Sequence, residues 1–188
     1  MRDLSFRRPL VADAPALWRL CRGSGQLDEN SPYAYLLVCS HFAATSVVAA
    51  RGGEEEEVVA FASAYRPPTA PEALFVWQIA VDPRARRRGV GRALLEELLE
   101  LPANLDATHL EATVTASNAA SERLFLSFAD DHGAACAVSV MFPAEAFPGG
   151  GHEAERLFRI GPLPDRQPCP PAPERPRAAP PPTTEVPA

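Results

Sequence analysis

The sequence contains no lysine, and all 18 of its basic residues are arginine. This absence excludes every mechanism that uses a lysine nucleophile or a lysine Schiff base. Arginine offers instead a planar and permanently charged group that fits phosphate oxygens well. The 24 acidic residues outnumber the basic ones and give a net charge of −6. That balance argues against a general nucleic-acid-binding protein.

Cysteine and long apolar runs are also scarce. The four cysteines, Cys21, Cys39, Cys136 and Cys169, form no CxxC pair and no zinc-binding pattern. Three of them lie among apolar neighbours and are expected to pack in the core, with a catalytic thiol as the weaker alternative. No run reaches the ~18 apolar residues of a membrane span, and the N-terminus lacks the features of a targeting peptide. We therefore expect a cytoplasmic protein without a metal or a membrane partner.

Proline marks the main boundary along the chain. Eleven of the 21 prolines lie between Pro162 and Pro187, in a stretch with almost no apolar residues. Such a segment buries too little surface to offset its ordering entropy, so residues 164–188 are predicted to be a disordered tail. The folded domain is predicted over residues 4–163, a length that suits one domain.

Strands and helices alternate within that domain. Hydrophobic periodicity predicts strands at residues 4–7, 46–50, 58–65, 74–81, 110–114, 135–141 and 157–160, and helices at 12–22, 30–42, 89–100 and 118–128. Asp13 is predicted to cap the first helix, and Pro32 to take the first position of the second. The run Glu54–Glu57 is predicted to be a solvated hairpin tip. This order is typical of a mixed α/β sheet covered by helices on both faces.

The most informative segment joins a buried strand to a helix through Arg86-Arg87-Arg88-Gly89-Val90-Gly91-Arg92. The unpaired amides of a first helical turn, together with the helix dipole, favour pyrophosphate binding. The two glycines let the backbone approach a ligand closely, and the arginines supply positive charge. The missing GK[ST] ending excludes a Walker loop, and the missing third glycine excludes the dinucleotide fingerprint. A basic helix start with a tight turn is the alternative interpretation.

This segment matches the R-x-x-G-x-G signature of the GNAT acetyltransferases, and the chain therefore resembles that superfamily. The resemblance implies a GNAT-type mixed, splayed central sheet of about seven strands flanked by about four helices. It also implies acetyl-coenzyme A as the cosubstrate, with main-chain groups along Ile79 to Val81 facing the thioester. The implied cofactor-binding residues in the turn and helix are Arg86, Arg87, Arg88, Gly89, Val90, Gly91 and Arg92.

A second segment supports the same resemblance. Asn118 opens a helix after a strand and is followed by Ser121 and Phe125. In the superfamily pattern this asparagine bonds the pantetheine arm, although a helix N-cap also explains Asn118. Phe125 departs from the tyrosine that is common at this place. The phenol that would protonate the leaving thiolate is therefore absent.

Further segments resemble one family within the superfamily, the diaminobutyrate acetyltransferases of ectoine biosynthesis. They include Gly25–Tyr35 (GQLDENSPYAY), Thr45–Ala49 (TSVVA), Tyr65–Pro68 (YRPP), Phe75–Gln78 (FVWQ) and His152–Glu155 (HEAE). The strings LDxNSxY and FVWQ are specific because neither has a role in binding coenzyme A. The resemblance covers about residues 7–160 and leaves out the glutamate run and the tail.

The family resemblance implies acetyl transfer to the 4-amino group of L-2,4-diaminobutyrate, giving the N4-acetyl product that an ectoine synthase cyclises. It also suggests a homodimer. The substrate carries two ammonium groups, so its pocket needs acidic residues, and Asp28 and Glu155 are the candidates. Trp77 is a candidate for cation–π contact and His152 for a further substrate contact. The alternatives are helix capping for Asp28, core packing for Trp77 and a surface position for His152.

The chemistry requires a neutral amine, whereas a primary ammonium has a pKa near ~10.4. A proton acceptor is therefore needed, and Glu155, or a water that it holds, is the candidate base. Tyr33 is the best substitute for the missing general acid, although it could equally pack the second helix.

Three competing interpretations remain open at this stage. The chain could acetylate another amine, or it could bind acyl-coenzyme A without turnover. The segment 84–92 could also be a nucleic-acid patch, but the net charge and the lack of interleaved aromatic residues disfavour this.

Overall fold

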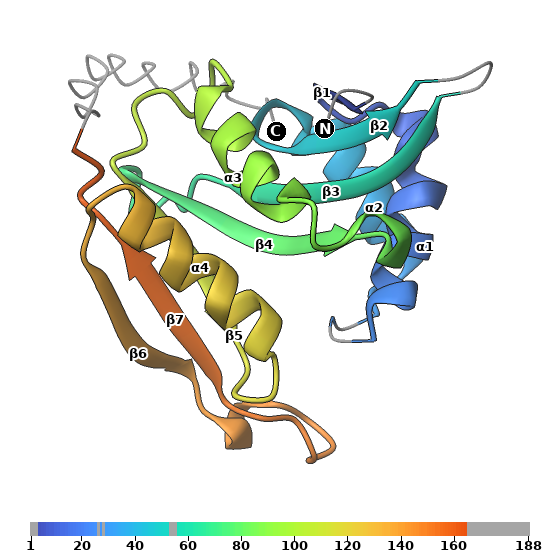
Figure 1. Cartoon of the computed structure of the whole chain (residues 1–188). Coiled ribbons are helices and arrows are strands. Elements are labelled where there is room, and N and C mark those ends of the chain that lie inside the picture. The colour runs from blue at the N-terminus through green and yellow to red at the C-terminus, as the bar shows by residue number, and fades with distance from the viewer. Residues whose placement is uncertain (1–3, 26, 28, 53–55, 165–188) are drawn as a thin grey trace, which may run out of the picture.

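The computed structural model describes residues 4–25, 27, 29–52 and 56–164. Asp28, Cys169 and the predicted tail beyond Pro164 lie outside the described residues. Seven strands form one sheet in the order β1-β2-β3-β4-β5-β7-β6 (Figure 1). The strands are β1 (Leu4–Arg7), β2 (Val47–Arg51), β3 (Glu57–Tyr65), β4 (Ala73–Val81), β5 (His109–Val114), β6 (Cys136–Phe142) and β7 (Glu155–Ile160). The helices are α1 (Ala14–Ser24), α2 (Pro32–His41), α3 (Val90–Glu100) and α4 (Ala119–Asp131).

The predicted elements are confirmed, with their ends displaced by three residues or fewer. Pro32 is the first residue of α2, as its fixed backbone angle favours. Asp13 is the N-cap residue of α1, as predicted, but its side chain makes no capping hydrogen bond to the helix. Its carboxylate instead accepts hydrogen bonds from the Leu10 amide and from Arg7, at 2.7 Å each, and fixes the turn before the helix.

Two apolar cores lie on opposite faces of the sheet. Alternate side chains of a strand point to opposite faces, and on β3 Ala60 and Ala62 pack on one side while Phe61 packs on the other. The first core includes the buried leucines of α3 and Phe128 of α4. The second is covered by α1 and α2. The four helices are thus divided between the two faces (Figure 1).

The sheet divides into two diverging halves at β4 and β5. These two strands are parallel, and their pairing covers only Ala73–Val76 with His109–Ala112. β4 continues to Val81 and β5 to Val114, and beyond the paired segment the strands separate (Figure 1). The splayed sheet implied by the GNAT resemblance is therefore confirmed.

A β-bulge sits where the strands begin to separate. Ser63 of β3 lies opposite Gln78 while Ala64 lies opposite Val76, so Trp77 is the extra residue on β4. A bulge re-aims the side chain that it carries. Trp77 keeps 39% of its surface exposed although its neighbours in the strand are largely buried.

Glu54 and Glu55 of the predicted solvated tip lie outside the described residues, whereas Glu56 and Glu57 are exposed and also form ion pairs. Glu56 pairs with Arg7 at 2.8 Å, and Glu57 pairs with Arg84 at 2.9 Å. Both carboxylates therefore tie the β2–β3 end of the sheet to its neighbours.

The predicted core role of the cysteines is confirmed for Cys21 and Cys39, whereas Cys136 is half-buried. Burial raises the pKa of the Cys39 thiol to about 11, which disfavours the reactive thiolate. Among the described residues, no helix is both long and apolar enough to cross a membrane.

Candidate active site

The opening between β4 and β5 exposes backbone groups of β4. The Asp82 amide donates to Val59 of β3 at 2.8 Å. Because amides alternate in direction along a strand, those of Ile79 and Val81 point to the other edge, where β5 no longer pairs. These two amides therefore face the opening.

The start of α3 lies beside this opening. Gly89 is its N-cap residue and adopts a left-handed backbone with φ of 75°, a conformation that favours glycine. The amides of the first turn have no acceptor within the helix and carry the positive end of its dipole. The α3 N-terminus therefore has the geometry of an anion site.

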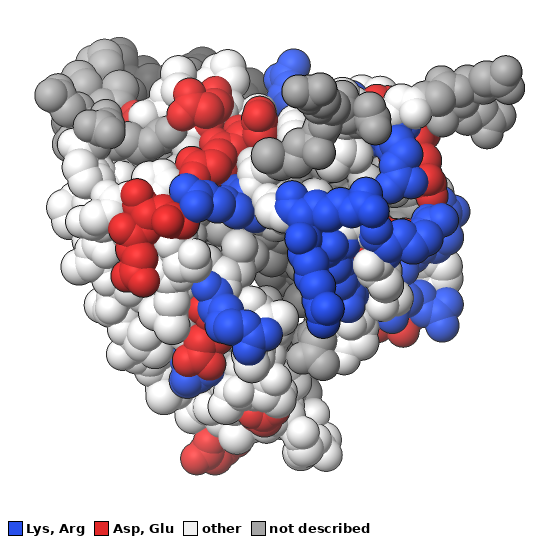
Figure 2. All heavy atoms as spheres, in the orientation of Figure 1, with Lys and Arg blue, Asp and Glu red and all other residues white. Residues whose placement is uncertain are grey.

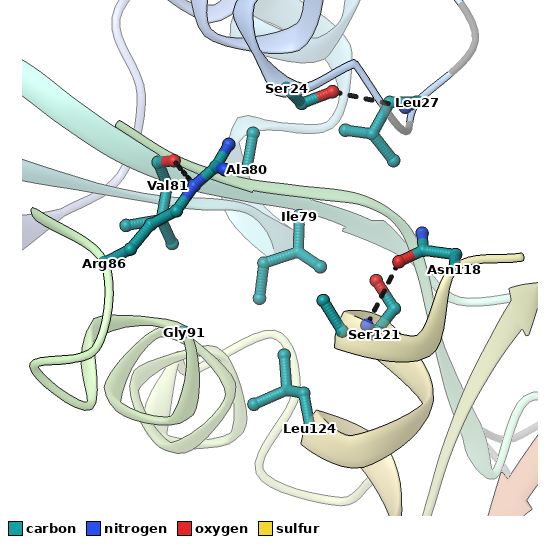
Figure 3. Close-up of a pocket in the computed structure, with 11 residues that line it drawn as sticks. Ser24, Leu27, Ile79, Ala80, Val81, Arg86, Gly91, Asn118, Ser121 and Leu124 are labelled. Carbon is teal, nitrogen blue, oxygen red and sulfur yellow. Dashed lines mark hydrogen bonds between the residues drawn. The ribbon is translucent and has the colours of Figure 1, made fainter. Parts of the chain in front are cut away.

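A cavity of about 200 Å³ lies between the splayed edge of β4, the start of α3 and the start of α4. It is lined by the predicted residues Ile79, Val81, Arg86, Gly91 and Asn118 (Figure 3). Its remaining lining residues are Ser24, Leu27, Ala80, Ala120, Ser121 and Leu124, of which Ala80 lies within the predicted segment from Ile79 to Val81. We refer to it as the cofactor cavity.

The arginines of the turn have different surroundings. Arg86 lines the cofactor cavity, and its Nε donates to the Val81 carbonyl at 3.0 Å, on the open edge of β4 (Figure 3). Arg87 and Arg88 are exposed and do not line the cavity. Figure 2 shows basic side chains gathered on this face of the molecule. Their positive field extends beyond the cavity itself.

The side chains of two predicted members of the cofactor set contact the rest of the fold, whereas their main-chain amides belong to the first turn of α3. Val90 is 2% exposed and packs in the first core. Arg92 forms ion pairs with Glu96 and with Asp131 of α4. Consecutive side chains of a helix point in different directions, so Val90 and Arg92 need not face the same ligand as Gly91.

Asn118 is the N-cap residue of α4, and its side chain also lines the cofactor cavity. Its Oδ1 accepts a hydrogen bond from the Ser121 amide at 3.1 Å, so it caps α4 (Figure 3). It is only 7% exposed and lines the cofactor cavity. The cap uses the oxygen of the side chain, which leaves the Nδ2 amino group as the donor for a ligand.

A second cavity of about 160 Å³ adjoins the first, with Asn118 and Leu27 lining both. It contains three predicted substrate residues, Trp77, His152 and Glu155. Its lining also includes residues to which no role was assigned: Asn30, Gln78, Thr113, Val114 and Thr115. Asn30 and Gln78 belong to the family-specific strings, and that signal could have identified them. We refer to it as the acceptor cavity.

Glu155 begins β7 and has an unusual environment. Its Oε2 is buried and has no hydrogen-bond partner among the described residues. The adjacent Arg156 pairs with Glu122 of α4 at 3.2 Å. A buried carboxylate oxygen without a partner is costly, so this position favours a cation or a donor brought by a ligand.

His152 lies at the outer wall of the acceptor cavity. Its ring stacks on Phe147 with centroids 3.8 Å apart, and its Nδ1 lies 2.6 Å from the Glu153 carbonyl oxygen. A carbonyl oxygen only accepts, so Nδ1 carries a proton. The surface position considered as an alternative is not supported, because the ring is half-buried against the cavity.

Two aromatic residues differ from what the sequence led us to expect. Tyr33 is in the first turn of α2, is 66% exposed and lines neither cavity, so the structure does not bring this candidate general acid to the site. The same exposure is unsuited to packing the helix. Phe125 is 2% exposed and belongs to the first core. Among the described residues no group of three or more His, Cys, Asp or Glu could hold a metal ion.

Comparisons with known proteins agree with this geometry. Residues 14–129 match the model of the acetyltransferase (GNAT) family. The chain is 47% identical over 162 residues to the L-2,4-diaminobutyric acid acetyltransferase of Streptomyces coelicolor, covering 86% of this chain and 94% of the relative. It is 44% identical over 160 residues to the enzyme of the same name from Shouchella clausii, covering 85% and 88%.

A solved structure is similar to the whole domain. It is the diaminobutyrate acetyltransferase of Paenibacillus lautus in complex with its substrate L-2,4-diaminobutyric acid and coenzyme A. It superposes with a TM-score of 0.80 at 42% identity and covers 86% of this chain and 96% of that chain. The chain therefore belongs to the GNAT acetyltransferases and, within them, to the L-2,4-diaminobutyric acid acetyltransferase family.

Proposed function

We propose that the protein transfers the acetyl group of acetyl-coenzyme A to the 4-amino group of L-2,4-diaminobutyrate. The curated relatives are named L-2,4-diaminobutyric acid acetyltransferases, and the Paenibacillus enzyme holds L-2,4-diaminobutyric acid and coenzyme A. The observation that carries the proposal is the buried Glu155 oxygen, which has no partner among the described residues and lines a cavity adjoining the cofactor cavity. A small ammonium-bearing acceptor fits that charge and that size.

The cofactor cavity supplies the means to hold the cosubstrate. The first-turn amides of α3 and the Arg86 guanidinium suit a pyrophosphate, and the Asn118 Nδ2 suits an amide carbonyl of the pantetheine arm. Acetyl-coenzyme A itself contributes the acetyl group as an activated thioester. The outward-facing amides of Ile79 and Val81 are placed to donate to the carbonyl oxygen as negative charge develops on it.

The acceptor cavity must bind an ammonium and then release its proton. With a pKa near ~10.4, only roughly one amine in a thousand is neutral at pH 7. Glu155 can attract the ammonium and accept its proton, directly or through a water. Trp77 presents a large aromatic surface beside the same position, which suits cation–π contact. Asp28, the second carboxylate proposed for the substrate, lies outside the described residues.

Measuring thiol release with a series of amines tests this proposal. The purified protein is mixed with acetyl-coenzyme A and with L-2,4-diaminobutyrate, a longer diamino acid or a polyamine. We expect the highest kcat/KM with diaminobutyrate. A higher value for another amine would assign the protein to a different acceptor.

Binding of acyl-coenzyme A without turnover is the second candidate, because Phe125 is buried at the place of the common tyrosine and Tyr33 lies outside both cavities. This candidate predicts tight acetyl-coenzyme A binding by calorimetry with no thiol release for any amine. Calorimetry and the thiol-release assay on one preparation of the protein therefore distinguish catalysis from binding without turnover.

We also propose that the protein is a cytoplasmic homodimer acting in ectoine biosynthesis and hence in osmoprotection. Support for self-association comes from β6, which pairs with β7 on one side only. Val138, Val140 and Phe142 on this strand are 49%, 60% and 44% exposed. Free edges are usually protected by charge or proline, and β6 has neither. Val140→Lys should shift the sedimentation profile from dimer to monomer; a monomeric wild-type protein would contradict the proposal.

A further inference from the structure

The connection between β6 and β7 contains contacts that the proposed mechanism does not use. His152 stacks on Phe147 at 3.8 Å with an angle of 14° between the rings, and Phe147 meets Phe142 of β6 edge-on at 6.5 Å. These three side chains form a row from the outer strand of the sheet to the wall of the acceptor cavity. We refer to Phe142, Phe147 and His152 as the ring row.

A second contact fixes the same connection from the other side. The Glu153 carboxylate Oε2 accepts a hydrogen bond from the Ser117 amide at 3.1 Å. That bond lowers the pKa of the Glu153 carboxyl, as a donor to the ionised form does. Ser117 directly precedes Asn118, which caps α4 and lines both cavities. Glu153 thus connects the β6–β7 connection to the loop that leads into α4.

The β6–β7 connection contains a run of three glycines, which by itself does not fix the positions of the neighbouring side chains. Gly149, Gly150 and Gly151 all have positive φ, at 89°, 70° and 83°. Glycine loses more conformational entropy on ordering than any other residue, so a run of three needs contacts at its ends. Phe147 lies before the run, and His152 and Glu153 follow it. The stacking holds the two ends of the connection together, and the Ser117 bond holds it against the loop before α4.

We infer that Phe147 and Glu153 are positioning residues, which hold the His152 ring at the wall of the acceptor cavity and thereby set the affinity for the amino-acid acceptor. The inference rests on the proposed function, because it takes the acceptor cavity as the place where the acceptor binds. Stacking fixes the plane of the imidazole. The bond that Nδ1 donates to the Glu153 carbonyl places a proton on Nδ1 and fixes the rotation of the ring in its plane, and hence the position of its Nε2 edge.

The proposal makes a specific kinetic prediction. An aromatic pair is worth ~0.5–1.5 kcal/mol beyond area burial, which corresponds to a factor of about two to ten. Phe147→Leu should raise the KM for diaminobutyrate by about that factor and leave the KM for acetyl-coenzyme A unchanged. Phe147→Tyr keeps the ring and should restore the wild-type KM.

Glu153 is tested with two variants and a control. Glu153→Ala removes the acceptor of the Ser117 amide and should raise the same KM about two- to fivefold, a small effect because the bond is exposed. Glu153→Gln keeps an oxygen that can accept and should recover most of the loss. Glu145→Ala is the matched control, since Glu145 is an exposed carboxylate of the same connection. It should behave as wild type.

Proton NMR of the histidine rings distinguishes a displaced His152 ring from a general loss of structure in the variants. The chain has four histidines, so the His152 resonances can be assigned by comparison with His152→Gln. Stacking at 3.8 Å should shift the His152 ring protons upfield through the ring current of Phe147. The shift should disappear in Phe147→Leu and persist in Phe147→Tyr. Thermal melts of each variant show whether the fold is kept.

The outcomes separate the inference from the proposed function. An unchanged His152 shift in Phe147→Leu would overturn the positioning role whatever the kinetics show. Normal KM values in Phe147→Leu and Glu153→Ala, with a raised KM in His152→Gln, would overturn it while leaving the acceptor cavity in place. If His152→Gln has a normal KM for diaminobutyrate, the ring does not meet the acceptor, and the inference and that part of the proposed site both fail.

Discussion

Replacing Glu155 by glutamine isolates the charge on which the proposed acceptor site depends. The carboxylate begins β7, and its Oε2 is buried without a partner among the described residues. Glutamine has nearly the same shape and lacks the charge. The substitution removes the attraction for the substrate ammonium and the proton acceptor, while the backbone and the packing stay in place.

The size of the effect follows from the bond that is lost. A hydrogen bond to a charged group is worth roughly 1.5–3 kcal/mol, so kcat/KM for diaminobutyrate should fall by at least ~tenfold. Affinity for acetyl-coenzyme A should not change, because Glu155 does not line the cofactor cavity. If Glu155 is also the proton acceptor, most of the loss should be in kcat, and raising the pH should partly restore the rate by increasing the fraction of neutral amine.

Stability provides the second readout, with Glu111 as the matched control. A half-buried carboxylate whose Oε2 is buried without a partner among the described residues adds little to stability, so Glu155→Gln should unfold at the wild-type denaturant concentration or slightly above it. Glu111 of the neighbouring strand β5 is buried, and it pairs with Arg159. Glu111→Gln should therefore cost about 1–3 kcal/mol of unfolding free energy and leave the KM for diaminobutyrate unchanged. Normal kinetics with lost stability in Glu155→Gln would refute the reasoning and make this carboxylate structural.

Three further substitutions or deletions test other parts of the structure. Gly91→Val should weaken acetyl-coenzyme A binding at least ~fivefold by calorimetry, because its first side-chain carbon would lie 3.4 Å from Leu124 and its methyls would enter the cofactor cavity; unchanged affinity would contradict this. Burial acts to raise the pKa of Asp13, but the bonds from Arg7 and Leu10 outweigh it and leave the pKa lowered. The stabilisation by Asp13 should therefore be complete above pH ~3.9 and be lost as pH falls through the lower folded pKa, so Asp13→Asn should cost about 1–3 kcal/mol at pH 7 and little near pH 2 in denaturant titrations. Truncation after Leu163, which is buried and donates to Thr108 at 2.8 Å, should leave turnover and thermal midpoint unchanged, and a drop of several degrees would show that the later residues pack on the domain.

The strands, the helices and the cofactor cavity were largely predictable from the sequence, because each depends on patterns among residues that are close together in the chain. Hydrophobic periodicity identified each strand and helix, since burial of one or both faces imposes it. The strand, the turn with Gly89 and the helix start are contiguous, so the cavity beside them could be expected. The sequence could not show which arginines of the run line the cavity, because the direction of each side chain depends on the conformation of the turn. Arg86 lines the cavity, whereas Arg87 and Arg88 point to solvent.

The acceptor cavity is the part that local patterns could not determine. Its walls come from four separate parts of the chain, around Leu27, Trp77, Thr113 and Glu155. Only the splay of β4 from β5 brings them together, and that depends on the length of the strand pairing. Resemblance to the family named Trp77, His152 and Glu155, and it suggested no role for Gln78 or Thr115. Tyr33 shows the limit of such reasoning, since its place in the first turn of α2 leaves it exposed outside both cavities.

The position of the new amide bond tests the central claim most directly. The protein is incubated with acetyl-coenzyme A and L-2,4-diaminobutyrate, and the product is identified by two-dimensional NMR. The account predicts a single product in which the acetyl group is on the 4-amino nitrogen, because the acceptor cavity orients that amine toward the thioester. Acetylation of the 2-amino group, a mixture of both isomers, or no product above the reaction without protein would contradict it.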